Sequence, residues 1–217
     1  MMKFIPYEVN CGEVNMQTDN DLLDEAIRNS LDYPIFRLYG WNPACVSLGR
    51  NQDDSFIDKA LLKNKKIDVV RRLTGGRALL HADEITYSFI CPVAYLEHGE
   101  HIVSSYKEIS QIFIDKFKLL GIDLAFGSSK PVKTGFDYCM LISTGADLCY
   151  QNRKLIGSAQ CRKQGYILQH GSILYNYDKL LLEEIFQEKV STDEIVSIKE
   201  INPKLTKKEI IDILSCN

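Results

Sequence analysis

Hydrophobic and polar positions repeat along the chain with two periods, and these periods predict a mixture of helices and strands. Residues 17–31 place leucine, isoleucine and alanine at helical spacing, and Asp19 or Asn20 is positioned to cap that helix. Residues 104–120 repeat apolar side chains every three or four positions and are followed by Gly121. Both segments are predicted to be amphipathic helices.

Runs of β-branched and aromatic residues bounded by turn residues predict the strands. The predicted strands are residues 35–39, 45–48, 68–72, 84–92, 146–151, 154–161 and 166–174. Residues 152–153 are predicted as a hairpin turn, residues 127–135 as a loop, and the part after residue 178 as helical pieces. The pattern therefore predicts an α+β fold, a single domain with a mixed β-sheet flanked by helices. The main domain is expected over residues 1–190, with a C-terminal helical tail over 191–217.

Composition narrows the class of partner. The 217 residues include 26 Lys plus Arg and 29 Asp plus Glu, for a net charge of −3, which disfavours a general nucleic-acid binder. The apolar stretches end well before the ~20 residues of a membrane span, and the N-terminus lacks the apolar core of a signal peptide. We expect a cytoplasmic protein that binds neither nucleic acid nor membrane.

Seven cysteines are scattered through the chain, at positions 11, 45, 91, 139, 149, 161 and 216. An odd, dispersed set is a poor disulfide framework, and no pair has Cys-x-x-Cys spacing. The four histidines are not spaced for zinc beside these cysteines either. We expect no structural metal, and we interpret most of the thiols as small buried hydrophobic groups.

Three short segments carry candidate chemistry. In residues 71–77 two glycines follow a strand, so backbone N–H groups could approach an anion or acyl carbonyl, and Arg72 and Arg77 could neutralise a phosphate. Lys154 is followed by small residues, and His170 stands in a Gln-His-Gly-Ser stretch with no identifiable acidic partner. Taken singly, each segment is equally consistent with a solvated turn, a bulged strand or a structural histidine.

Together these segments resemble the lipoate-protein ligase and octanoyltransferase superfamily. The resemblance rests on RRLTGGRALLH at residues 71–81, RKLIGSAQ at 153–160, ILQHGSIL at 167–174 and the Trp-Asn-Pro to Ser-Leu-Gly stretch at 41–49. It extends over about residues 15–185. It implies the biotin/lipoate ligase-like catalytic fold, an α+β domain whose mixed sheet forms a cleft.

Within the superfamily, the chain is more similar to the transferases than to the ATP-dependent ligases. Arg77 stands where ligases usually have a third glycine, and His81 is followed by Ala-Asp rather than by Asp. The interval from Cys139 to Lys154 is that of the nucleophile and motif lysine in Gram-positive-type octanoyltransferases. The family's Pro-Ser pair after this cysteine is missing, with Thr144 and Asp147 as stand-ins for its hydroxyl and acid. We also expect no accessory domain of the kind that bacterial ligases commonly carry after the catalytic domain.

The resemblance implies that Cys139 and Lys154 are catalytic, with Lys154 favouring the Cys139 thiolate. An octanoyl group would pass from octanoyl-acyl carrier protein, through a Cys139 thioester, to a lysine of a lipoyl-domain protein such as the glycine cleavage H protein, without metal or nucleotide. This reaction belongs to lipoate biosynthesis. The implied substrate-binding residues are Arg72, Thr74, Gly75, Gly76, Arg77, His81, Gly157, Ser158, Ala159, His170 and Gly171.

Three alternatives remain open from the sequence. An ATP-dependent lipoate or octanoate ligase would use Lys154 to bind an acyl-adenylate and leave Cys139 incidental. An amidotransferase would move octanoyl from the glycine cleavage H protein to dehydrogenase subunits, also through a cysteine. A non-catalytic member would only bind lipoyl domains or acyl carrier protein.

Overall fold

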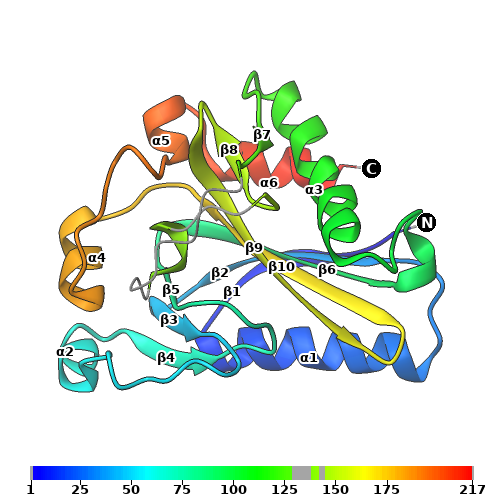
Figure 1. Cartoon of the computed structure of the whole chain (residues 1–217), viewed down its shortest axis with the longest axis horizontal. Coiled ribbons are helices and arrows are strands. Elements are labelled where there is room, and N and C mark those ends of the chain that lie inside the picture. Colours follow the sequence, from blue (N-terminus) through cyan, green and yellow to red (C-terminus); the bar gives the residue numbers. More distant parts are fainter. Residues whose placement is uncertain (1, 129–137, 142–144, 217) are drawn as a thin grey trace.

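The computed structural model describes residues 2–128, 138–141 and 145–216, and it contains two β-sheets. The larger sheet has the strand order β1-β2-β6-β10-β9-β8-β7, and the smaller has the order β4-β3-β5 (Figure 1). The strands are β1 (Lys3–Asn10), β2 (Ile35–Trp41), β3 (Cys45–Leu48), β4 (Asp68–Arg71), β5 (Leu79–His81), β6 (Glu84–Pro92), β7 (Ala125–Phe126), β8 (Leu148–Tyr150), β9 (Arg153–Lys163) and β10 (Tyr166–Leu174). The helices are α1 (Gly12–Arg28), α2 (Lys59–Asn64), η1 (Val93–Tyr95), α3 (Ile102–Leu119), η2 (Cys139–Leu141), α4 (Lys179–Phe186), α5 (Ile198–Ile201) and α6 (Lys207–Ser215).

The larger sheet is mixed and is covered on both faces. β1 pairs with β2 in parallel, and the other pairs are antiparallel. Leu22, Leu23 and Ala26 of α1 are buried in an apolar cluster on one face, and Phe113 and Phe117 of α3 are buried in the main core on the other (Figure 1). Because both faces are covered, every residue of β2 is buried.

Helix α1 begins at Gly12, earlier than the predicted start at residue 17, and its N-cap residue is Cys11. The prediction that Asp19 caps this helix is wrong. The Asp19 side chain lies within the helix, is 2% exposed and forms an ion pair with Arg37 of β2 at 2.9 Å. Asp19 therefore joins α1 to the sheet through a buried ion pair.

The predicted bounds of β3, β6 and β10 are confirmed, whereas β1, α2, β5 and β7 were not predicted. β1 has no fully buried residue because it lies at the edge of the sheet, so its apolar positions do not alternate cleanly. The hairpin turn is one residue earlier than predicted, at Gln151 and Asn152, which both have positive φ. Residues 129–135 of the predicted loop lie outside the described residues.

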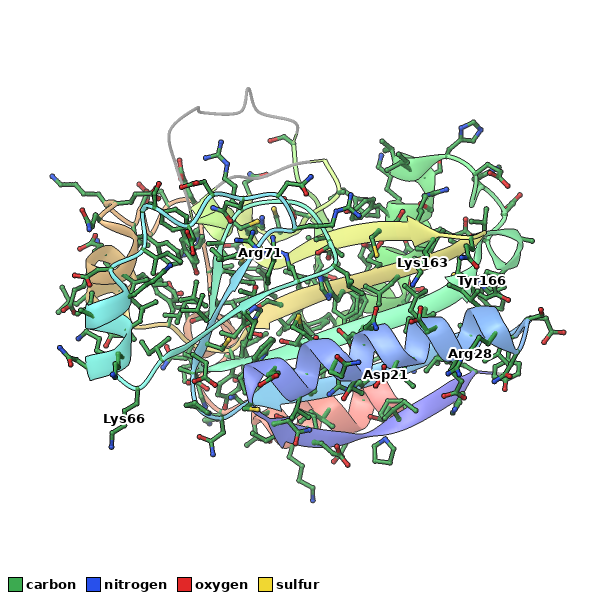
Figure 2. The ribbon with its side chains drawn as sticks, turned by 90° about the horizontal axis from the view of Figure 1, so that it is seen from below. Asp21, Arg28, Lys66, Arg71, Lys163 and Tyr166 are labelled. Atoms are coloured by element: carbon green, nitrogen blue, oxygen red, sulfur yellow. The ribbon has the colours of Figure 1, made fainter. Side chains whose placement is uncertain are left out.

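The β9–β10 hairpin rests against the C-terminal part of α1. Lys163 forms an ion pair with Asp24 at 2.6 Å, and the Tyr166 hydroxyl donates to the Leu31 carbonyl at 3.0 Å. Figure 2 shows Lys163 and Tyr166 beside the part of α1 that carries Arg28. These exposed or half-exposed contacts fix one end of the sheet against the helix.

The segment from residue 191 onward contains α5 and α6, preceded by a stretch without helix, and it packs into the main core. Ile195, Val196 and Ile198 are fully buried there. The Lys154 N–H donates to the Glu194 carbonyl at 2.8 Å, and the Lys154 carbonyl accepts from the Val196 N–H at 3.0 Å. The proposed boundary at residue 190 therefore does not coincide with a break in packing. Among the described residues, no helix is both long and apolar enough to cross a membrane.

Candidate active site

A pocket lies between the two sheets and is lined by residues of both. Its walls come from α1, β2, β3, β5, β6, η2, β9 and β10, so the fold brings distant segments to one place. The predicted site residues that line it are Arg72, His81, Cys139, Gly157, Ser158, Ala159, His170 and Gly171. Lys154 and Thr74 lie directly behind this wall, where each contacts a lining residue.

The predicted turn residues Gly75, Gly76 and Arg77 are not among the lining residues in the described part of the chain. Gly76 has a φ of +94°, and a Cβ added there would lie 3.0 Å from the Arg72 guanidinium. A Cβ on Gly49, at the end of β3, would lie 1.9 Å from the Gly76 carbonyl oxygen. These glycines are required by the shape and close packing of the turn. Direct contact of the turn with substrate stays a prediction.

Cys139 and Lys154 meet at the edge of the pocket. The Cys139 N–H donates to the Ala78 carbonyl at 2.8 Å, and the Lys154 ammonium donates to the Cys139 carbonyl at 3.2 Å. Lys154 is 1% exposed and pairs with Asp147 at 3.1 Å. Burial alone would lower the pKa of Lys154, but the charges of Asp147 and of the Cys139 sulfur raise it overall. Lys154 is therefore a cation beside Cys139. Thr144 lies outside the described residues.

Gly157 explains why small residues follow the lysine. A Cβ at this position would lie 2.8 Å from Cε of Lys154 and 2.9 Å from the Met140 sulfur. The Lys154 side chain therefore passes close against the Gly157 backbone on its way to η2. A larger residue would displace the ammonium from the Cys139 carbonyl.

Arg72 is almost fully buried, and its guanidinium organises the turn that follows β4. Its Nε donates to the Thr74 hydroxyl at 3.1 Å, and its Nη1 donates to both the carbonyl and the hydroxyl of Ser47, at 2.9 and 3.2 Å. Its Nη2 donates to the carbonyls of Gly75 and Arg77 at 2.9 and 2.7 Å. Burial lowers the pKa of Arg72. All five N–H groups of the guanidinium thus have protein acceptors, and direct binding of a substrate anion by Arg72 stays a prediction.

His81 lies between a hydroxyl and a carboxylate, and we call Ser47, His81 and Glu84 the His81 triplet. Ser47 Oγ and His81 Nε2 are 2.7 Å apart, and His81 Nδ1 and Glu84 Oε1 are 2.8 Å apart. Glu84 also accepts hydrogen bonds from the hydroxyls of Thr86 and Ser172. Burial alone would raise the pKa of Glu84, but the charge of His81 and these hydrogen bonds lower it overall. Glu84 is therefore ionised.

His170 has an analogous arrangement, and we call Thr74, His170 and Asp19 the His170 triplet. Thr74 Oγ1 and His170 Nε2 are 2.7 Å apart, and His170 Nδ1 and Asp19 Oδ2 are 3.5 Å apart. Asp19 also pairs with Arg37 and accepts from the Tyr39 hydroxyl at 2.9 Å. Burial lowers the pKa of His170. Burial alone would raise the pKa of Asp19, but its contacts with His170, Arg37 and Tyr39 lower it overall.

Sequence reasoning missed three members of these triplets: Ser47, Glu84 and Asp19. The His81–Glu84 pair could have been found, because the two residues are three apart in sequence. The acidic partner of His170 could not, since Asp19 is separated from it by 151 positions and looked like a helix cap. The sequence-based statement that His170 has no identifiable acidic partner is thus corrected by the fold.

Comparison with known proteins identifies the family of the chain. The family described as the lipoyl protein ligase A/B catalytic domain matches residues 12–217. The chain is 37% identical over 195 residues to an Octanoyltransferase LipM of Staphylococcus aureus, covering 85% of this chain and 68% of the relative. It is 34% identical over 204 residues to that of Clostridioides difficile, covering 91% and 72%. The chain spans about two thirds of the length of such relatives, with 66% and 65% in two further cases.

Among solved structures, a lipoate-protein ligase A bound with ATP has a TM-score of 0.75 at 22% identity. The alignment covers 98% of this chain and 81% of the ligase. A bipartite lipoate protein ligase from Thermoplasma acidophilum, solved with its E2 lipoyl domain, has a TM-score of 0.69 at 19% identity and covers 99% and 81%. The predicted α+β fold and the predicted superfamily are both confirmed. The chain belongs to the lipoyl protein ligase A/B catalytic domain family.

Proposed function

We propose that the protein is an octanoyltransferase of lipoate biosynthesis in which Cys139 carries the octanoyl group as a thioester. The observation that carries the proposal is the buried Lys154 ammonium held on the Cys139 carbonyl. The curated relatives named Octanoyltransferase LipM support the reaction class. The proposed donor is octanoyl-acyl carrier protein, and the proposed acceptor is a lysine of a lipoyl domain such as that of the glycine cleavage H protein.

The chemistry follows from the pairing of a thiol with a cation. A free cysteine of pKa ~8.5 is only a few per cent thiolate at neutral pH, and a neighbouring ammonium increases that fraction. The Cys139 thiolate attacks the carbonyl of the octanoyl thioester, a new C–S bond forms, and the carrier leaves as its thiolate. The acceptor amine then attacks the Cys139 thioester, so that an amide C–N bond forms and the Cys139 sulfur is released.

The pocket suits an apolar acyl chain even though polar residues line it. Met16, Leu79 and Met140 contribute apolar walls, and each methylene buried there is worth ~0.8 kcal/mol. The hydroxyl and imidazole groups of the two triplets are hydrogen-bonded to one another. Because these groups already have partners, an alkyl chain can pass them without leaving a buried polar atom unpaired.

The test is formation of the acyl-enzyme in the absence of ATP. Wild-type protein incubated with octanoyl-acyl carrier protein should gain the mass of one octanoyl group, and the acceptor should then become octanoylated. Cys139→Ala should lose both signals, whereas the matched controls Cys149→Ala and Cys161→Ala should keep them. Product that requires ATP and free octanoate, with full activity in Cys139→Ala, would contradict the proposal in favour of a ligase.

A second experiment tests the role of Lys154. Lys154→Met should slow both acylation and the alkylation of Cys139 by iodoacetamide at neutral pH, because the sulfur loses a neighbouring positive charge. An alkylation rate that this substitution leaves unchanged would restrict Lys154 to holding the η2 backbone. The reference protein carries Ala in place of the exposed Cys216 and the half-buried Cys11 and Cys161, so that alkylation of these thiols does not obscure the rate.

A further inference from the structure

We propose that His81, aligned by Glu84 and reached through the Ser47 hydroxyl, is the base that accepts the proton of the acceptor lysine in the transfer step. This inference rests on the proposed octanoyltransferase function and assigns its second half-reaction. The observation behind it is the hydrogen-bonded series from Ser47 to His81 to Glu84 in the wall of the pocket that contains Cys139.

The transfer step needs a base. A lysine side chain has a pKa of ~10.4, so the acceptor arrives as an ammonium that must lose a proton before its nitrogen can attack. Lys154 is itself a cation paired with Asp147, and the sulfur of Cys139 is acylated at that stage. The proton therefore goes to another group that reaches the pocket.

The hydrogen-bond pattern of the His81 triplet accommodates the proton positions that the proposed step needs. Ser47 Oγ accepts a hydrogen bond from Nη1 of Arg72 at 3.2 Å and lies 2.7 Å from His81 Nε2, so its own hydrogen can point at that nitrogen. Glu84 is ionised and can only accept, so His81 Nδ1 carries the hydrogen between these two residues. The proposed step uses His81 in this tautomer, with its Nε2 lone pair taking a proton delivered through the Ser47 hydroxyl.

The surroundings of His81 favour this role. Its ring stacks on Trp41 with centroids 4.0 Å apart and an interplanar angle of 18°, and the Trp41 indole N–H donates to the Thr86 hydroxyl at 2.7 Å. The ring therefore has a fixed orientation. The Glu84 carboxylate lies against Nδ1, where it stabilises the imidazolium that forms when Nε2 is protonated.

The position of β5 places this imidazole on the side of the nucleophile. Leu79 and His81 are two residues apart in β5 and therefore lie on the same side of the strand. Both line the pocket together with Cys139. The Ala78 carbonyl, at the start of this strand, accepts the Cys139 N–H at 2.8 Å. One short segment thus carries the base and anchors the backbone of the nucleophile.

The His170 triplet is less suited to the same task. Among the described residues Ser47 lines the pocket and Thr74 does not, so the hydroxyl of the His170 triplet lies farther from a bound substrate. The charge of Asp19 is already balanced by Arg37, and His170 Nδ1 is 3.5 Å from Asp19, against 2.8 Å between His81 and Glu84. The structure therefore favours His81.

In the proposed step two protons leave the acceptor nitrogen, one C–N bond forms and one C–S bond breaks. The acceptor ammonium gives one proton to Ser47 Oγ while the Ser47 hydroxyl proton passes to His81 Nε2. The amine nitrogen attacks the acyl-Cys139 carbonyl, a C–N bond forms, and the C–S bond breaks. The second nitrogen proton goes to the departing Cys139 sulfur, and His81 returns its proton to solvent after the amide product leaves.

The test separates the two half-reactions in the full-length protein. His81→Gln is loaded with octanoyl-acyl carrier protein, and acylation is followed by intact mass before a lipoyl domain is added. Acylation should stay within about threefold of wild type, while transfer at neutral pH should fall at least about 100-fold. The deficit should shrink as pH rises, because the acceptor amine then arrives already deprotonated.

Other charged and titratable groups lie near His81, namely Glu84, Arg72, His170 and Cys139. A control is therefore needed to show that a change in the pH dependence of transfer comes from His81. His170→Gln changes the neighbouring histidine, and its two half-reactions should fall in parallel without recovery at high pH. Ser47→Ala removes only the hydroxyl between substrate and base, and should repeat the His81→Gln pattern. If circular dichroism shows that His81→Gln does not fold, Ser47→Ala still tests the proposal.

Two results would overturn the inference while leaving the proposed function intact. One is unimpaired transfer in both His81→Gln and Ser47→Ala. The other is an equal loss of acylation and transfer, which would make His81 part of the binding wall. Absence of any acyl-enzyme in wild-type protein would instead overturn the proposed function, and this inference with it.

Discussion

The His81 and His170 triplets have the same composition, a hydroxyl, a histidine and a carboxylate, and differ in what balances the carboxylate. Asp19 faces the Arg37 guanidinium, with both side chains 2% exposed. In the described residues Glu84 faces His81 and the neutral hydroxyls of Thr86 and Ser172. A carboxylate paired with an arginine holds two secondary-structure elements together. A carboxylate beside a histidine can instead stabilise the imidazolium that forms when the histidine takes up a proton.

Their locations in the fold fit this difference. The His170 triplet joins α1, β10 and the turn after β4, and through Arg37 it also reaches β2. The His81 triplet stays within β3, β5 and β6 at the pocket wall. Arg72 links the two, since it donates to the hydroxyls of both Ser47 and Thr74. We therefore expect the His170 triplet to matter more for stability and the His81 triplet more for transfer.

The largest expected effect separates the two carboxylates by stability. Asp19→Asn leaves the buried Arg37 without its counter-ion, which should cost about 3–5 kcal/mol of unfolding free energy. Glu84→Gln leaves hydrogen-bonding groups mismatched but strands no permanent cation, and should cost about 1–3 kcal/mol. Urea unfolding measures both. The control is Asp24→Asn on α1, the helix that also carries Asp19. This change breaks the exposed ion pair with Lys163 of β9 and should cost less than about 1 kcal/mol of unfolding free energy. Equal losses for the two buried carboxylates would remove the distinction.

An intermediate effect is expected from the residue that the triplets share. Arg72→Lys offers three N–H groups to five acceptors, so buried acceptors stay unpaired at a cost of about 1–3 kcal/mol. Both hydroxyls then lose their orientation, and acylation and transfer should both decline. Arg71→Lys is the matched neighbour, because Arg71 is exposed on the face that Figure 2 presents. Loss of transfer alone in Arg72→Lys would show that Arg72 serves the His81 triplet and not the other.

The smallest effect is a pH dependence of stability. Burial places the folded-state pKa of His170 below the ordinary value of 6.5, so the unfolded chain binds the proton more readily. This contribution is complete above pH 6.5 and is lost as pH falls toward the folded-state pKa, by about 1.4 kcal/mol per pH unit at most. Asp19 and Glu84 have lowered pKa values, so their contributions are lost only below their ordinary values of 3.8 and 4.5.

His170→Gln should therefore make the decline in melting temperature between pH 6.5 and 5 shallower. The exposed His98→Gln is the control and should leave the slope of wild type unchanged. A wild-type slope in His170→Gln would mean that His170 binds protons equally in the folded and unfolded chain.

The sequence was informative where a local rule decides the structure. β6 and β10 were predicted with their true bounds, because strand-forming residues run between turn residues in both segments. β1 was missed because an edge strand buries neither face fully. β5, three residues long, was missed although it carries His81. It lies at the edge of the smaller sheet, paired with β3, and three residues are too few to show an alternating pattern.

The site was only partly predictable for the same reason. The motif lysine and the cysteine were recognised by spacing, and the structure brings them into contact. Ser47 was seen only as part of a strand, and Asp19 only as part of a helix. Their roles depend on contacts between segments far apart in sequence, and local spacing carries no record of such contacts.

The two backbone hydrogen bonds that join Lys154 to Glu194 and Val196 have a consequence for the order of events during synthesis. Chains emerge from the ribosome N-terminus first, so Cys139 and Lys154 both precede the segment that fixes the lysine backbone. Until that segment has joined the sheet, the backbone of Lys154 lacks these two hydrogen bonds. If Lys154 activates Cys139 as proposed, that activation is complete only after the C-terminal segment has been synthesised and has packed against β9.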